Sequence, residues 1–167
     1  MVLHHLNSIL SVDSSRINNY EEFNDVWKLK VDDAFAKELT ERWISAWNRH
    51  RLKEIISIYS ENIEFHSPKL RQIYPNLTSA KITNRVDLER YFCLGLKKYP
   101  NLHFNPSGYF LRDQIVIIEY SVTPMNSIQW LVMEKFEIDK QGLIGKSSAL
   151  RRRILIDGNA FLHPELI

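Results

Sequence analysis

Residues 35–68 read FAKELTERWISAWNRHRLKEIISIYSENIEFHSP, and this stretch decides the fold class of the chain. Its apolar side chains recur every third or fourth position, as they do along one stripe of an α-helix. The positions are Phe35, Leu39, Trp43, Ala46 and Trp47 and, after a polar break, Leu52, Ile55, Ile56 and Tyr59. Residues 60–62 then turn the chain into a strand that ends near Pro68. The stretch therefore predicts a helix, a second helix and a strand.

The rest of the chain predicts one more helix followed by a run of hairpins. Asn84 is a suitable N-cap for this helix, and Pro100 ends it. From residue 101 the apolar period changes to two, which is the period of half-buried strands. The strands are expected near residues 102–110, 115–122, 128–138 and 143–154. Helices followed by an antiparallel meander give the α+β class, with the helices packed on one face of a curved sheet.

A single domain is expected over residues 34–156, with an N-terminal extension at 1–33 and a C-terminal tail at 157–167. The extension mixes turn-forming residues with scattered aromatics, and a short helix over Tyr20, Phe23 and Trp27 fits their spacing. The connection at 69–85 is long enough to be a loop across the mouth of a pocket, as lids often are.

Composition limits the classes of function. A net charge of +2 and a charged content of 25% do not favour bulk attraction to nucleic acid. No apolar run would span a bilayer, and no secretory signal is evident, so we expect no membrane association and a cytoplasmic protein. We expect no metal, because Cys93 is alone and the histidines lack ligand spacing, and no cofactor, because the five glycines form no nucleotide loop. Residues 151–153 are three arginines, which we interpret as the solubilising charge of an edge strand.

The order of these elements and a set of short motifs resemble the nuclear transport factor 2-like superfamily, in particular its small SnoaL-like members. The motifs are Trp43, Ala46-Trp47-Asn48, Tyr59, Ser67-Pro68, Tyr91-Phe92, Pro100-Asn101-Leu102-His103-Phe104, Glu134-Lys135-Phe136 and Gly142-Leu143-Ile144. The resemblance covers about residues 35–154 and implies a cone, in which a bent sheet wraps around the first helix and leaves a pocket. It also implies a homodimer through the outer face of the sheet.

The sequence departs from this pattern at Arg51, where many relatives have an aspartate that caps the second helix, and at residues 83–85, where many have a glycine. The superfamily includes isomerases, polyketide cyclases, epoxide hydrolases and transport adaptors, so the resemblance does not choose a function.

Glu134 is the most informative polar residue because it alone interrupts the apolar face of the predicted strand at 128–138. A carboxyl group among apolar neighbours has a raised pKa and suits a general base or acid near neutral pH. The other interpretation is a structural network, in which Glu134 pairs with a buried Arg, His or Tyr. His66, at the end of the first strand, is the second catalytic candidate, with a partly exposed structural histidine as the alternative.

Six aromatic side chains could line a pocket for a flat apolar ligand, although core packing is the alternative for each. They are Trp43, Trp47, Tyr59, Tyr91, Tyr120 and Trp130.

The sequence thus leaves two functions open. The first is a SnoaL-like binding protein for a small apolar or aromatic molecule. If it is an enzyme, it is a cofactor-independent isomerase or cyclase-type lyase with Glu134 as base and His66 or a tyrosine as hydrogen-bond donor. The second is a non-catalytic, dimeric interaction module whose exposed sheet face, with Leu131 and Met133, binds a partner.

Overall fold

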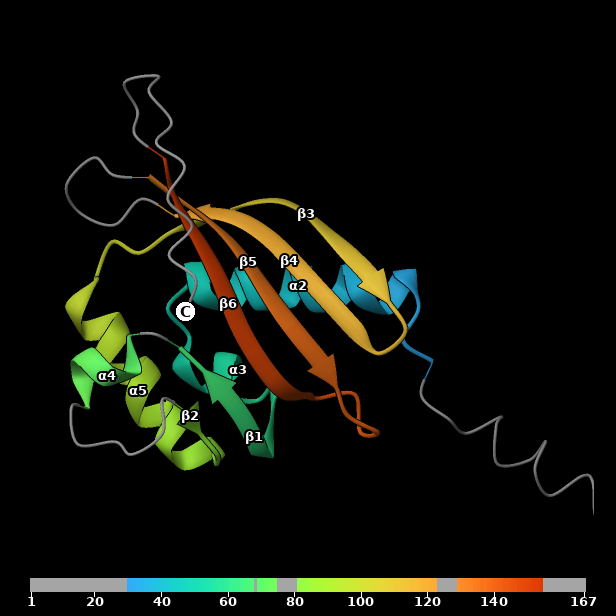
Figure 1. The fold of residues 1–167 in the computed structure, drawn as a ribbon, viewed down its shortest axis with the longest axis horizontal. Helices are drawn as coiled ribbons and strands as arrows, with labels where there is room; N and C mark the ends of the chain where they lie inside the picture. Colours follow the sequence, from blue (N-terminus) through green and yellow to red (C-terminus); the bar gives the residue numbers. More distant parts are fainter. Residues whose placement is uncertain (1–29, 68, 75–80, 123–128, 155–167) are drawn as a thin grey trace, which may run out of the picture.

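The computed structural model describes residues 30–67, 69–74, 81–122 and 129–154 (Figure 1). The helices are α2 (Asp33–Asn48), α3 (Leu52–Ile56), α4 (Leu70–Ile73) and α5 (Arg85–Lys98). The strands are β1 (Tyr59–His66), β2 (Lys81–Ile82), β3 (Phe104–Arg112), β4 (Ile115–Val122), β5 (Gln129–Ile138) and β6 (Ile144–Ile154). The predicted α+β class is confirmed. The predicted helix over Tyr20, Phe23 and Trp27 and the C-terminal tail lie outside the described residues.

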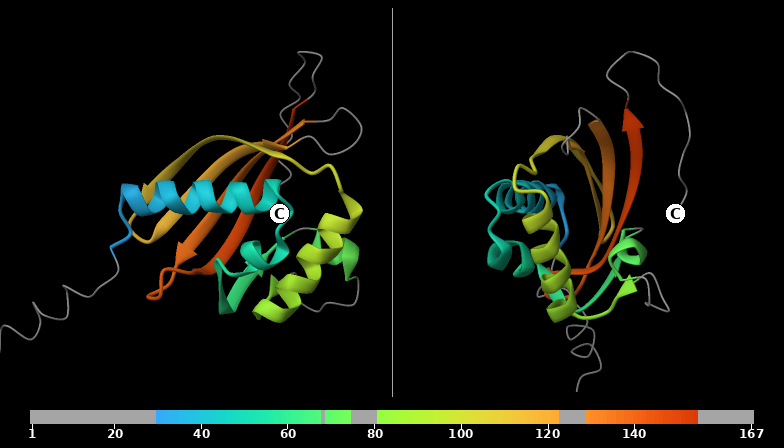
Figure 2. Two further views of the ribbon diagram at one scale, coloured as in Figure 1. Left: turned by 180° about the vertical axis from the view of Figure 1, so that it is seen from behind. Right: turned by 90° about the vertical axis from the view of Figure 1, so that its left-hand side faces the viewer.

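The six described strands form one curved sheet in the order β2-β1-β6-β5-β4-β3. β3 to β6 are the predicted antiparallel meander, but β1 pairs with β6 in parallel, so the sheet is mixed rather than wholly antiparallel. Parallel pairing is possible here because β1 and β6 are not joined by a tight turn: the connection between them contains α5 and the strands β3, β4 and β5. α2 and α5 lie on the concave face (Figure 2). The sheet stays open, with β2 and β3 as its edges.

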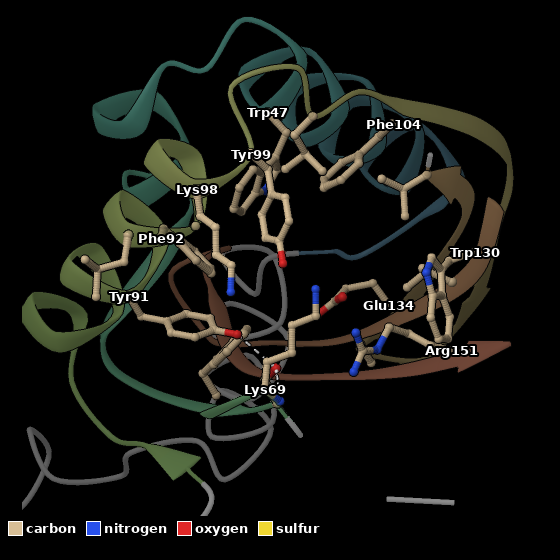
Figure 3. A pocket seen from close by; sticks show the side chains of 18 of the residues that line it. Trp47, Lys69, Tyr91, Phe92, Lys98, Tyr99, Phe104, Trp130, Glu134 and Arg151 are labelled. Carbon is tan, nitrogen blue, oxygen red and sulfur yellow. Dashed lines mark hydrogen bonds between the residues drawn. The ribbon is translucent and has the colours of Figure 1, made fainter. Parts of the chain in front are cut away.

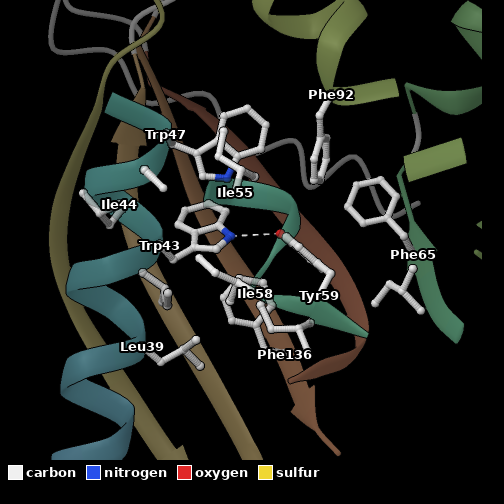
Figure 4. Close-up of a cluster of buried hydrophobic side chains, with 14 of the residues drawn as sticks. Leu39, Trp43, Ile44, Trp47, Ile55, Ile58, Tyr59, Phe65, Phe92 and Phe136 are labelled. Carbon is white, nitrogen blue, oxygen red and sulfur yellow. Dashed lines mark hydrogen bonds between the residues drawn. The ribbon is translucent and has the colours of Figure 1, made fainter. Parts of the chain in front are cut away.

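α2 packs its apolar stripe against the sheet. The helix begins after Asp32, whose carboxylate accepts a hydrogen bond from the Phe35 backbone N–H at 3.0 Å. Leu39, Trp43 and Trp47 are buried, as the sequence predicted (Figure 4). The indole Nε1 of Trp43 donates to the Tyr59 hydroxyl at 2.8 Å, which ties α2 to β1 through a buried hydrogen bond.

α5 has the predicted cap, since the Asn84 side chain accepts from the Asp87 backbone N–H at 2.8 Å. Its buried residues Leu88, Tyr91 and Phe92 face the core, while Leu96 is only partly buried. At the start of α3, by contrast, Arg51 makes no capping hydrogen bond through its side chain. The departure seen in the sequence therefore changes the local cap and leaves the fold intact.

The connection at residues 69–85 is more regular than predicted. Its described part contains α4, the edge strand β2 and the fully buried Leu70. β2 pairs antiparallel with β1, where Phe65 lies opposite Ile82. Because these apolar side chains are buried, this segment packs against the core and is not a free loop. Residues 75–80, the remaining part of the predicted lid, lie outside the described residues.

Candidate functional site

A pocket of about 900 Å³ lies between the sheet and the helices α2 and α5 (Figure 3). Ligand pockets in proteins commonly have volumes of roughly 300–1,000 Å³ and mostly apolar walls with a few polar groups. Its aromatic lining residues are Trp43, Trp47, Tyr59, Phe65, Tyr91, Phe92, Tyr99, Phe104, Tyr120 and Trp130. The described core therefore does not fill the concave side of the sheet completely.

The structure brings seven of the eight predicted site residues to this pocket. All six predicted aromatic residues line it, together with Glu134. Trp43 and Trp47 come from α2, Tyr59 from β1, Tyr91 from α5, Tyr120 from β4, and Trp130 and Glu134 from β5. Side chains from α2, β1, α5, β4 and β5 thus line one pocket. Whether these side chains hold a ligand stays a prediction.

Glu134 is buried in the sheet wall, with 7% of its surface exposed. The Ser147 hydroxyl, from the neighbouring β6, donates to Oε1 at 2.7 Å. The Tyr120 hydroxyl donates to Oε2 at 3.5 Å, which is the outer limit of a hydrogen bond. Among the described residues no lysine or arginine lies within 4.0 Å of this carboxylate. Two hydroxyl groups orient the carboxyl group, but no ion pair neutralises it.

This environment raises the pKa of Glu134 to about 7. Burial is the largest cause, because it disfavours the charged form, while the hydroxyls of Ser147 and Tyr120 and the charge of Arg151 act in the opposite direction. A carboxyl group with a pKa near 7 is present in both protonation states at neutral pH. It can therefore either accept or donate a proton there.

Three tyrosine hydroxyls in the pocket stay protonated. Burial raises the pKa of Tyr91 and raises the pKa of Tyr59 and of Tyr120 well above the ordinary value of 10. The Tyr59 oxygen accepts from Trp43, which leaves the Tyr59 proton available. The Tyr91 hydroxyl lies 3.1 Å from Ser67 Oγ. The Tyr59 and Tyr91 hydroxyls can donate hydrogen bonds to a ligand oxygen at any pH near neutrality, while the Tyr120 hydroxyl already donates to Glu134.

The structure does not bring His66 to the pocket. β1 alternates in burial, and its inward positions are Ile63 and Phe65, so His66 points to the opposite face. There its Nε2 lies 2.8 Å from Glu64 Oε1, and Glu64 also contacts Lys81 at 3.2 Å. The expectation that His66 lies at the pocket rim is not met, because His66 is not among the residues that line the pocket.

The interpretation of residues 151–153 as edge-strand charge was wrong for Arg151. β6 lies inside the sheet, and Arg151 lies opposite Val132, on the same face as Glu134. Its guanidinium carbon is 5.7 Å from the centre of the Trp130 ring, and the side chain lines the pocket. The alternation of Ser147, Ala149 and Arg151 along the strand was the available signal.

Lys69 and Lys98 also line the pocket and were missed because they come from a connection and from a helix end. Lys69 precedes α4, and Lys98 ends α5. Their places in the sequence give no pocket-facing pattern. Within the described ranges, no group of three His, Cys, Asp or Glu side chains has the geometry of a metal site. None of the described helices has the length and apolar character needed to cross a bilayer.

The comparisons with known proteins agree with this architecture. A SnoaL-like protein of unknown function from Burkholderia thailandensis is 27% identical with a TM-score of 0.66, over 73% of this chain and 98% of that chain. A putative ketosteroid isomerase from Kribbella flavida is 15% identical with a TM-score of 0.57, over 78% of this chain and 83% of that one. A putative polyketide cyclase from Sinorhizobium meliloti is 10% identical with a TM-score of 0.55, over 67% and 93%. At 15% and 10% identity, the likeness to the last two proteins concerns the fold alone.

The search among curated proteins found no match. The sequence pattern of the SnoaL-like domain matches residues 40–145, which is more than half of the chain and includes the part of α2 that carries Trp43 and Trp47, the whole of α5 and the strand that carries Glu134. The chain belongs to the SnoaL-like domain family.

Proposed function

We propose that this protein binds a small, flat, largely apolar molecule in the pocket and moves a proton on it with Glu134. The observation that carries the proposal is a carboxyl group with a pKa of about 7 in the wall of an aromatic cavity of about 900 Å³. Aromatic walls favour a planar apolar body, and a poised carboxyl group is the polar contact that suits proton transfer. Two solved structures of the same fold carry the names putative ketosteroid isomerase and putative polyketide cyclase, which agrees with this class of reaction.

In the proposed reaction, ionised Glu134 removes a proton from a carbon next to a carbonyl group of the ligand. The negative charge moves to the carbonyl oxygen, which accepts a hydrogen bond from a tyrosine hydroxyl of the pocket. Tyr91 is our choice of donor, because its hydroxyl is held at 3.1 Å from Ser67 and stays protonated. Glu134 then returns the proton to another carbon of the ligand. In a ring closure the enolate carbon instead attacks a second carbonyl carbon of the ligand, and Glu134 returns the proton to the alkoxide oxygen that this attack creates. No cofactor takes part in these steps.

Two measurements test the proposal. A thermal-shift screen with planar ketones, phenols and acids should find compounds that raise the melting temperature of the wild type. In D₂O, bound ketones should then exchange their acidic C–H protons with wild type and not with Glu134→Gln, as followed by NMR. Glu137→Gln is the matched control, because Glu137 lies three residues on along β5 and points to the outer face, where it pairs with Lys135 at 2.8 Å. Stabilisation by none of the compounds would refute the binding function.

We also infer that the protein forms a homodimer through the outer face of the sheet. Phe110 and Leu150 are 56% and 59% exposed there, and Met133, which lies opposite Leu150, is also exposed. Met133 and Leu150 are neighbours on this face, and adjacent exposed apolar side chains on a sheet can mark an interface. The double change Met133→Glu with Leu150→Glu should convert a dimer to a monomer in light scattering at micromolar concentration, while Val86→Glu on α5 should not. A monomeric wild type would refute the inference.

A further inference from the structure

Four cationic side chains line the pocket together with Glu134. They are Lys69, Lys97, Lys98 and Arg151. Figure 3 shows Lys69, Lys98 and Arg151 directed into the space that Glu134 faces. Among the lining residues, all of which belong to the described part of the chain, Glu134 is the only carboxylate. The polar character of this cavity is therefore mainly cationic.

These cations lack acidic partners within the described ranges. None of the four is within 4.0 Å of a described carboxylate, whereas the cations around Glu64 on the outer face are paired. Aromatic rings contact three of them instead. Lys69 Nζ lies 5.2 Å and Lys98 Nζ 5.6 Å from the centre of the Tyr99 ring, and Arg151 lies over Trp130. A ring face attracts a cation, but it does not neutralise the charge.

The three cations also repel one another. The pKa of Lys69 is lowered first by burial and then by the charges of Arg151 and Lys98. Like charges that share a partly desolvated space raise the free energy of the empty pocket. Glu134 relieves only part of this, since its pKa of about 7 leaves it partly uncharged at neutral pH and mostly uncharged below it. An anion between the cations would bind at a site that is already prepared for it.

We propose that the ligand of this pocket is an amphipathic acid: an aromatic or flat apolar body against Trp47, Phe92 and Phe104, and an oxyanion held by Lys69, Lys98 and Arg151. This proposal rests on the proposed binding function and narrows its ligand class. The body occupies the aromatic wall between α2 and α5, and the oxyanion occupies the mouth where α4, the end of α5 and β6 meet. A carboxylate and a phosphate share the chemistry that this mouth recognises.

A matched set of probes tests the ligand class on the unmodified protein by calorimetric titration. 2-Naphthoate, 2-naphthyl phosphate and the neutral 2-naphthamide share one aromatic body, and inorganic phosphate has only the oxyanion. At least one naphthyl anion should bind about tenfold more tightly than the amide, and rising salt should weaken the anion alone. Whichever of 2-naphthoate and 2-naphthyl phosphate binds more tightly shows whether the pocket prefers a carboxylate or a phosphate. Inorganic phosphate alone should bind far more weakly than either.

Single variants test the residues. Lys69→Gln and Arg151→Gln should each weaken binding of the anion by about tenfold and leave the amide unchanged, because each removes a charge-assisted contact. Arg152→Gln is the matched control, since Arg152 is the next residue on β6 and is exposed on the outer face.

The outcomes separate this proposal from the proposed function. Equal binding of anion and amide by the wild type would overturn the amphipathic acid and leave the pocket function standing. Binding of inorganic phosphate as tight as that of the naphthyl anions would also overturn it, because the aromatic body would then contribute nothing. Binding of none of the four probes, together with an empty thermal-shift screen, would overturn both.

Discussion

Glu64 and Glu134 are two glutamates on the same sheet, and the structure shifts their pKa values in opposite directions. Glu64 lies on the outer face of β1, where His66, Lys81 and Lys146 contact it and hold its pKa at about 2. Glu134 lies on the inner face of β5, where burial raises its pKa to about 7. The sheet thus separates a carboxylate that stays ionised from one that can exchange protons. The face that a strand residue occupies decides which chemistry it can perform.

The largest effect is expected for Glu134→Gln, which should change how the stability of the folded protein depends on pH. The folded-state pKa of Glu134 lies above the ordinary value of 4.5, so the folded protein binds the proton more tightly than the unfolded chain. Wild-type stability should therefore fall as pH rises from 4.5 to about 7, by about 3 kcal/mol from this group. The variant lacks this loss and should be more stable than wild type above about pH 7.

Urea titrations across this pH range measure the effect. Glu137→Gln, on the outer face of the same strand, serves as control and should follow the wild type. Parallel pH profiles of wild type and Glu134→Gln would contradict the buried, raised-pKa description of this carboxyl group.

Ser147→Ala should have the next largest effect. Its hydroxyl donates to Glu134 Oε1 at 2.7 Å and favours the ionised form. Losing this bond should cost about 2 kcal/mol where Glu134 is charged, at about pH 8, and less where it is protonated, at about pH 5. Ser148→Ala, which changes the next residue on the outer face, should show no such pH dependence. An equal cost of Ser147→Ala at both pH values would show that the bond does not distinguish the two charge states.

Tyr120→Phe should have a smaller effect on the same group. The hydroxyl lies 3.5 Å from Glu134 Oε2, so the bond is weak, and the ring keeps its packing against Trp43 and Phe104. The free energy of unfolding should change by less than about 1 kcal/mol, and the pKa of Glu134 should rise slightly. The carboxyl ¹³C shift of Glu134, followed during a pH titration, measures this. A fall in that pKa would contradict the assigned direction of the hydrogen bond.

Glu64→Gln should have the smallest effect. The Glu64 side chain is partly exposed, and its ion pairs are screened by salt. Because its folded-state pKa is depressed to about 2, any stability that it contributes is present above pH 4.5 and is lost as pH falls toward 2. Thermal melting at neutral pH should shift by no more than about 2 °C, and salt at roughly 0.5 M should abolish the difference. A large, salt-resistant shift would show that the outer-face cluster is structural.

Much of this arrangement follows from local patterns in the sequence. The helical stripe predicted the burial of Trp43 and Trp47, and the period of two along β5 predicted that Glu134 points inward. Both signals depend on a few adjacent residues, because the direction of a side chain is set by the local backbone. The position of the aromatic residues around one cavity was predicted from the resemblance of the whole chain to SnoaL-like proteins.

The parts that could not be predicted depend on contacts between distant segments. Arg151 was interpreted as edge charge because the sequence of a strand does not show its position in the sheet. Lys69 lines the pocket because the fold brings its side chain to the Tyr99 ring at the end of α5. For His66 a local signal was present, since Ile63 and Phe65 mark the inward positions of β1. Continuing this alternation by one residue places His66 on the outer face.

The parallel pairing of β1 with β6 has a consequence for how the domain folds. Tyr59 lies opposite Ile144, so the sheet joins segments from early and late in the domain. Contacts between residues far apart in sequence require closure of a long loop, and domains rich in them fold slowly. α2, α3 and β1 can collapse early, but during synthesis Trp43 lacks its packing partners Phe104, Tyr120 and Phe136 until β3, β4 and β5 have been made, and β1 lacks its parallel neighbour until β6 follows. This interval is when the chain is most prone to aggregation.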